Sequence, residues 1–245
     1  MPGWLSHFFH RAILVSCLLL PASGFARTEV LITGEWPPYT GVREPQGGSV
    51  SAVVRQALAA EGMDVRIGFF GWNRVRPLMT TNKDYGGRFP DYYSPERAKG
   101  CHYSNVIGES PLGLAELRAR PLHWSKVQDL VDYRVGTVKT YVNAPIFDRL
   151  VSEGKIRTVE SADDEGNLWN LLNGKVDAVI IDRNVYAYLM SRSPRLKAEA
   201  YRMQLNQKVL IVHKLYVCFS RNEDGRRLRD SFNKGLMSLQ APGPR

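Results

Sequence analysis

The sequence has few of the residues from which metal, nucleic-acid or nucleophilic-enzyme sites are built. It holds five histidines and three cysteines, and the histidines beyond residue 26 (His102, His123 and His213) lack metal-ligand spacing. The sequence contains no G-x-S-x-G, phosphate-loop or H-E-x-x-H motif, so none of these catalytic motifs indicates an enzyme. The net charge of +9 comes from scattered Lys and Arg without a basic block. We therefore predict no metal, no cofactor and no nucleic-acid partner.

Long hydrophobic runs are also missing, apart from one near the start. Arg11 precedes the apolar run 12–20, and Gly24 and Ala26 supply small residues where a signal peptidase would cut. The run is too short to span a bilayer, which needs ~20 apolar residues. Residues 1–26 are therefore predicted to be a signal peptide, and the mature chain to be soluble and periplasmic.

Two cysteines remain after such a cleavage, Cys101 and Cys218. Export permits a disulfide between them, because the periplasm is oxidising. Cys218 also lies in the apolar run 215–219, where a free cysteine behaves as a small buried hydrophobe. The sequence leaves both interpretations open.

Strand and helix patterns alternate along most of the chain, which predicts parallel α/β sheets. The first series has strand candidates at 29–33, 65–70 and 85–89 and helix candidates at 50–58 and 72–81. The second has strand candidates at 133–138, 155–159 and 178–181 and helix candidates at 124–131, 144–153, 161–173 and 184–190. An extended segment, 207–220, and an amphipathic helix, 226–239, complete the chain.

Two such series predict two lobes, with the segment 112–123 crossing out and the chain returning near residue 210. We expect lobe I to comprise 27–117 and 209–245, and lobe II to comprise 118–208. A protein with two crossings can close on a ligand about a hinge. The ligand is expected beyond the carboxyl ends of the strands, where Asp182 and the segment after Phe89 lie.

The segment Ser94-Pro95-Glu96-Arg97 has the pattern of a helix start. Ser94 suits the capping position and Pro95 the first helical position. A guanidinium in the first turn is an arrangement that holds an anion, most naturally a carboxylate. The alternative is that Arg97 forms an ordinary salt bridge that stabilises its own helix start.

Several segments in order along the chain, together with a helix that starts at Gly47-Gly48, resemble the family 3 extracellular solute-binding proteins, the polar amino acid-type receptors of ABC importers. They are EWPPYTG (35–41), GWNR (71–74), FPDYYSPERAKGCHYS (89–104), YRVGTVKTY (133–141), LLNGKVDAVIIDRNV (171–185) and LYVCFSRNEDGRRLRDSFNKGL (215–236). The resemblance implies a two-lobed periplasmic binding protein fold of type II and a small, carboxylate-bearing, amino acid-like solute. It further implies a membrane permease as partner, a monomer and no enzymatic activity.

The resemblance also implies roles for individual residues. Arg97 matches the arginine that grips a ligand carboxylate, and Asp182 matches the acid that receives the ammonium group. The remaining matches are Trp36 or Tyr39 and Trp72 as aromatic walls, and Thr140 and Tyr141 as second-lobe donors to the carboxylate. Of the adjacent Tyr92 and Tyr93 we expect only one to face the cleft, and we assign Tyr92 to the ligand site. From its position alone, Asp182 is equally suited to cap the following helix, and Trp72 to pack in a core.

The chain departs from the family pattern at the expected site. Phe89, Pro90 and Tyr92 stand where amino acid receptors place small hydroxyl residues, and Thr140 replaces a loop glycine. These changes remove hydrogen-bond donors and add aromatic surface, which is typical of a divergent, aromatic-rich branch.

Two other functions fit the same fold. One is an enzyme similar to the periplasmic cyclohexadienyl dehydratases, for which Glu109, Asp163 and Asp182 are the available acids. The other is an accessory module that binds a partner protein and has lost its solute.

Overall fold

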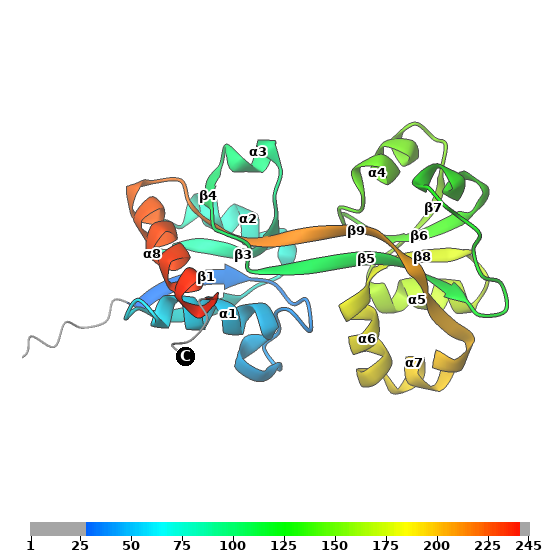
Figure 1. The fold of residues 1–245 in the computed structure, drawn as a ribbon, viewed down its shortest axis with the longest axis horizontal. Helices are drawn as coiled ribbons and strands as arrows, with labels where there is room; N and C mark the ends of the chain where they lie inside the picture. Colours follow the sequence, from blue (N-terminus) through cyan, green and yellow to red (C-terminus); the bar gives the residue numbers. More distant parts are fainter. Residues whose placement is uncertain (1–27, 241–245) are drawn as a thin grey trace, which may run out of the picture.

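The computed structural model describes residues 28–240, so the expected signal peptide 1–26 lies outside the described residues. The chain forms two α/β lobes joined by two long strands, β5 and β9 (Figure 1). This is the two-lobed α/β arrangement that the alternating patterns predict. None of the helices within 28–240 has both the length and the apolar character needed to cross a bilayer.

Lobe I is built on three parallel strands in the order β2-β1-β3. Its elements are β1 (Thr28–Thr33), η1 (Pro45–Gly47), α1 (Ser49–Ala59), β2 (Asp64–Phe69), α2 (Trp72–Thr81), β3 (Gly87–Tyr92), α3 (Pro95–Ala98), β4 (Cys101–Tyr103) and the C-terminal helix α8 (Glu223–Gln240). As expected, Ser94 caps α3, because its hydroxyl accepts a hydrogen bond from the amide of Arg97 at 3.1 Å.

Lobe II repeats this plan with parallel strands in the order β8-β6-β7. Its elements are η2 (Val127–Asp132), β6 (Arg134–Val138), α4 (Pro145–Ser152), β7 (Arg157–Ser161), α5 (Asp164–Leu172), β8 (Ala178–Asp182), α6 (Arg183–Arg192), α7 (Pro194–Glu199) and η3 (Ala200–Arg202).

Two antiparallel strands, β5 (Gly108–Leu117) and β9 (Met203–Ser220), join the lobes. In lobe I β9 pairs with β3, and in lobe II β5 pairs with β8, so a single sheet runs through both lobes. The outward crossing therefore begins near residue 108, earlier than the segment 112–123. The lobe boundaries at 117 and 208 stay predictions, because both strands continue from one lobe into the other.

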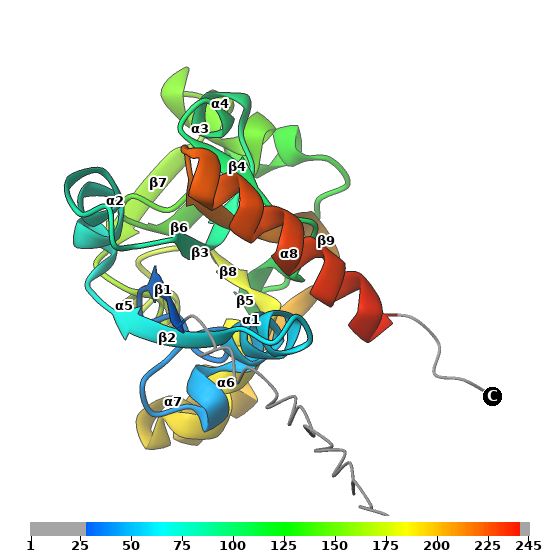
Figure 2. The same cartoon turned by 90° about the vertical axis from the view of Figure 1, so that its left-hand side faces the viewer.

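One buried cluster extends from lobe I into lobe II, and a second lies on the lobe II side. In lobe I the valines and leucine of α1 at positions 50, 54 and 58 are buried at helical spacing against the sheet. Helix α8 crosses the end of lobe I that faces away from lobe II (Figure 2), and its Phe232 packs 5.4 Å from Phe219. A Cβ at Gly235 would collide with the carbonyl oxygen of Ala57, so glycine permits α8 to approach α1 closely. The second cluster includes Leu130, Phe147 and Ile180 of lobe II.

Candidate functional site

Parallel strands bring the residues after their carboxyl ends to one edge of a sheet, where α/β proteins place their ligands. In lobe II the strands β6, β7 and β8 end at Val138, Ser161 and Asp182, and in lobe I β1 and β3 end at Thr33 and Tyr92. Side chains on and after these ends, with one each from β5 and β9, form what we call the interlobe site. Its members are Trp36, Tyr39, Tyr92, Ser110, Tyr141, Asp164, Asp182 and His213.

Asp182 is the most highly connected of these residues. Its Oδ1 accepts hydrogen bonds from the amides of Asn184 and Val185 at 2.7 and 3.0 Å, so it caps α6. Its Oδ2 accepts the Tyr39 hydroxyl at 2.8 Å and the Ser110 hydroxyl at 2.6 Å. The capping role that its position suggested is thus present. The same carboxylate also joins lobe II to Tyr39 of lobe I.

Aromatic rings of lobe I surround this contact. The ring of Trp36 lies 4.5 Å from that of Tyr39 and 6.0 Å from that of Tyr92. The Tyr92 hydroxyl is 2.8 Å from the Ser110 hydroxyl, and its ring stacks on His213 at 4.2 Å. Burial raises the pKa of both tyrosines, and the charge of Asp182 adds to the effect. Both phenols therefore remain protonated donors at neutral pH.

Further contacts tie the lobes together at the edges of the site. A ring nitrogen of His213 lies 2.6 Å from the carbonyl oxygen of Asn143, which precedes α4. Asn184 donates its amide to the Tyr39 hydroxyl at 2.8 Å. The Tyr188 hydroxyl of α6 bonds to the Glu44 carboxylate of lobe I at 2.6 Å. The lobes are thus in direct contact through side chains.

Asp164 is a site residue that the sequence analysis missed. It occupies the first position of α5, where burial raises the pKa of its carboxyl to about 7. The charge of Asp182 raises this pKa further, whereas a long hydrogen bond of 3.5 Å from the Tyr141 hydroxyl lowers it. The available signal was its position: Asp164 follows a strand that is parallel to the strand ending at Asp182.

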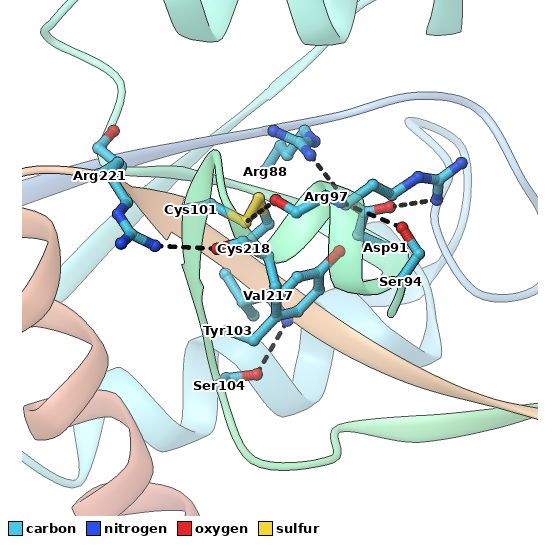
Figure 3. The surroundings of a disulfide bond; sticks show 12 residues. Arg88, Asp91, Ser94, Arg97, Cys101, Tyr103, Ser104, Val217, Cys218 and Arg221 are labelled. Atoms are coloured by element: carbon cyan, nitrogen blue, oxygen red, sulfur yellow. Dashed lines mark hydrogen bonds and ion pairs between the residues drawn. A yellow bond between two sulfur atoms is a disulfide. The ribbon is translucent and has the colours of Figure 1, made fainter.

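Arg97 lies in lobe I in a cluster of its own (Figure 3). Its Nη1 donates to Asp91 Oδ1 at 2.9 Å and to the carbonyl oxygen of Tyr92 at 3.3 Å. Asp91 also bonds to Arg88 at 2.7 Å. The salt bridge weighed in the sequence analysis is therefore present. The carboxylate-gripping role of Arg97 stays a prediction.

The structure separates the other predicted residues from one another. The indole of Trp72 packs over Gly34 and donates to the carbonyl oxygen of Glu35 at 2.9 Å, with 41% of the residue exposed. Tyr141 contributes its hydroxyl to Asp164, whereas the neighbouring Thr140 is exposed. Of the adjacent pair Tyr92 and Tyr93, only Tyr92 joins the interlobe site. Tyr93 is 56% exposed and packs edge-on to Tyr103.

Thr140 has a left-handed backbone, with φ of 70°, in the loop after β6. A β-branched residue is strained in this region, and the strain costs about 1–2 kcal/mol. We expect Thr140→Gly to raise the free energy of unfolding by about 1 kcal/mol, measured by urea denaturation. Thr137→Gly, at a buried strand position, serves as a control and should destabilise. A loss of stability in Thr140→Gly would show that the loop is not strained.

A cavity of about 420 Å³ opens between the lobes next to this network. It shares Tyr39 and Asn184 with the contacts of Asp182, and its other walls come from the start of α1 and from α6. They are Pro38, Ser49, Ala187, Tyr188 and Ser191. The cavity is large enough for a small solute. Its lining includes neither Arg97 nor the two aspartates, Asp164 and Asp182.

The acids considered for catalysis lie in different surroundings. Glu109 is exposed and ion-paired with Lys214. Asp163 is exposed and caps α5 by accepting a hydrogen bond from the amide of Gly166 at 2.7 Å. The helix predicted over 161–173 begins later, at Asp164, because Ser161 still belongs to strand β7. Among residues 28–240 there is no group of three or more His, Cys, Asp or Glu able to hold a metal ion.

The fold is similar to solved structures of ligand-binding domains. The holo arginine-binding protein ArgBP of T. maritima matches with a TM-score of 0.67 and 14% identity, covering 88% of this chain and 92% of that one. A histidine kinase sensor domain with similarity to periplasmic binding proteins matches with a TM-score of 0.70 and 16% identity, covering 88% and 91%. The GluR0 ligand-binding core of Nostoc punctiforme in complex with L-glutamate matches at 0.65 and 16%, covering 86% and 92%.

No protein-family model and no curated protein matches the sequence. The structural matches, at these identities, define the fold class: a two-lobed, periplasmic binding protein-like fold.

Proposed function

We propose that the protein binds a small, amino acid-like solute between its lobes and delivers it to a membrane permease of an ABC importer. The observation that carries the proposal is the contact between Tyr39 of lobe I and Asp182 of lobe II. Asp182 supplies a buried carboxylate from lobe II, and Tyr39 supplies a phenol from lobe I. A solute between the lobes would therefore meet polar or aromatic groups on both sides. Closure of the hinge formed by β5 and β9 would then enclose the solute.

Known ligand-binding domains support this proposal through the shared fold. The arginine-binding protein and the glutamate-bound core hold amino acids, and the third match is a histidine kinase sensor domain. The aromatic cluster of Trp36, Tyr39 and Tyr92 has the composition of a small-molecule site, with large apolar faces and a few placed polar atoms. We further propose that the mature protein is a periplasmic monomer.

Calorimetry against pooled metabolites tests the proposal. A ligand should be found, and Tyr39→Ala should weaken its binding by about tenfold or more, since the ring and the hydroxyl of Tyr39 both face the site. Tyr93→Ala is the matched control, because Tyr93 is exposed outside the site, and it should change affinity less than twofold. The site is assigned wrongly if Tyr39→Ala binds as tightly as the parent protein.

A second candidate function is an acid-catalysed dehydratase, and the carboxyl of Asp164 favours it. A carboxyl with a pKa of about 7 can donate a proton at neutral pH, as a general acid must. Incubation with prephenate or arogenate separates the two functions. Formation of an aromatic product that stops in Asp164→Asn would establish the enzyme. Unchanged substrate at high protein concentration would leave binding as the function.

A further inference from the structure

The charges of the interlobe site are distributed differently from those that an amino acid ligand requires. Such a ligand presents a carboxylate and an ammonium group, and each needs a partner of opposite charge. In this protein the carboxylate partner of Arg97 is already supplied by Asp91, which is 9% exposed and also binds Arg88. Arg97 is therefore already ion-paired within lobe I, in a cluster that keeps a net charge of +1 because Arg88 and Arg97 share one aspartate.

Lobe II presents the opposite situation, with two carboxylates and no basic partner. Among residues 28–240, no Lys, Arg or His forms an ion pair with Asp164 or Asp182. Four short hydrogen bonds satisfy Asp182. Asp164 has one side-chain hydrogen bond, the 3.5 Å contact with Tyr141. A half-buried carboxylate without a cation is costly, and a positively charged ligand would remove that cost.

The rings around these carboxylates favour the same kind of ligand. Tyr92 lies close enough to both Asp164 and Asp182 for their charges to act on its hydroxyl, and Trp36 packs against its edge. Aromatic faces attract ammonium and guanidinium groups, whereas they provide no donor for a carboxylate. The substitution of Tyr92 for a small hydroxyl residue therefore changes the kind of ligand that fits.

We infer that the interlobe site binds an organic cation, an amine or guanidinium compound whose charged group pairs with Asp164 beside Tyr92 and Tyr141, and that it requires no ligand carboxylate. This inference rests on the proposed function and narrows its ligand class. It makes Asp164 a specificity-determining residue and leaves Arg97 as a structural member of lobe I.

The sharpest probe is a pair of compounds that differ only in the carboxylate, agmatine and L-arginine. In calorimetry on the mature, disulfide-bonded protein at pH 8, agmatine should bind at least as tightly as arginine, and glutarate should not bind. Asp164→Asn should weaken agmatine binding by about tenfold or more, the loss of one charged contact. Asp163→Asn is the matched control, because this neighbour is exposed and asparagine also caps helices, and it should change affinity less than about twofold.

A second readout is the pH dependence of agmatine binding. With its pKa raised to about 7, Asp164 is mostly protonated at pH 5.5 and mostly ionised at pH 8. Agmatine keeps its charge over this range, so its affinity should rise by about tenfold from pH 5.5 to pH 8. The groups that surround Asp164 are Asp182, Asp163, Tyr141 and Tyr92, and His213 stacks on the ring of Tyr92. The part of the pH dependence of agmatine affinity that is lost in Asp164→Asn is due to ionisation of Asp164.

Two results would overturn the inference. One is arginine binding more than tenfold tighter than agmatine with that preference lost in Arg97→Ala, which would restore the carboxylate-gripping role. The other is no binding of agmatine, putrescine or arginine at 10 mM. In either case the metabolite screen tests the proposed function separately. An anionic or zwitterionic ligand found in that screen would support solute binding and would contradict only the inference that the ligand is a cation.

Discussion

Replacing both Cys101 and Cys218 by alanine is expected to lower the free energy of unfolding by about 3–5 kcal/mol. The two residues form a disulfide that joins β4 to β9, and 117 positions of sequence separate them. The closed loop contains all of lobe II. A cross-link over so long a loop removes many conformations from the unfolded chain, which is the main way in which disulfides stabilise proteins.

Urea denaturation of the double variant, compared with the parent protein with and without reductant, measures this effect. Reducing the parent protein should cause the same loss as the double variant, because both sulfur atoms are buried and the alanines fill part of their space. Alanine is preferred to serine for the same reason, since a buried hydroxyl would add a cost of its own. Equal stability of the oxidised and reduced parent would contradict the prediction.

Much of the fold could be predicted from local patterns, because those patterns are set by short-range physics. The alternation of strand and helix periods gave the parallel sheets of both lobes. The Ser-Pro-Glu-Arg pattern gave the cap of α3, since capping depends on neighbouring residues only. Strand β5 was less clear. Its sequence GESPLGLAEL contains a proline and two glycines, so its pairing with β8 and β9 comes from tertiary context.

The candidate site was harder to predict, because its contacts join residues far apart in the chain. Position on the sheet edge identified Asp182, but not that its second oxygen accepts the hydroxyls of Tyr39 and Ser110. Arg97 was recognised from its helix start, whereas its pairing with Asp91 depends on how β3 ends. Asp164 was missed because the helix was predicted to begin at 161, whereas residue 161 remains in strand β7 and the helix begins at Asp164. In each case a long-range contact decided between roles that the local sequence allowed.

Asp182→Ala is expected to have the largest effect on the site itself. It removes the cap of α6, which costs about 0.5–2 kcal/mol. It also leaves the hydroxyls of Tyr39 and Ser110 without their shared acceptor, at about 1–3 kcal/mol for each group that stays buried and unpaired. Tyr39 and Ser110 are almost fully buried, with 4% and 0% of each residue exposed. The free energy of unfolding should therefore fall by about 3–5 kcal/mol in urea denaturation.

Asp182→Asn separates the structural and electrostatic parts of this effect. Asparagine keeps a carbonyl oxygen that can cap α6, so the loss of stability should be about 1 kcal/mol. It removes the negative charge, so agmatine binding should still fall by about tenfold or more, whereas Asp182→Ala should lose about 100-fold. Asp230→Ala, which removes two ion pairs at the surface of α8, should change neither quantity appreciably. If Asp182→Ala has the same free energy of unfolding and the same affinity for agmatine as the parent protein, then Asp182 neither holds the lobes together nor contributes to the site.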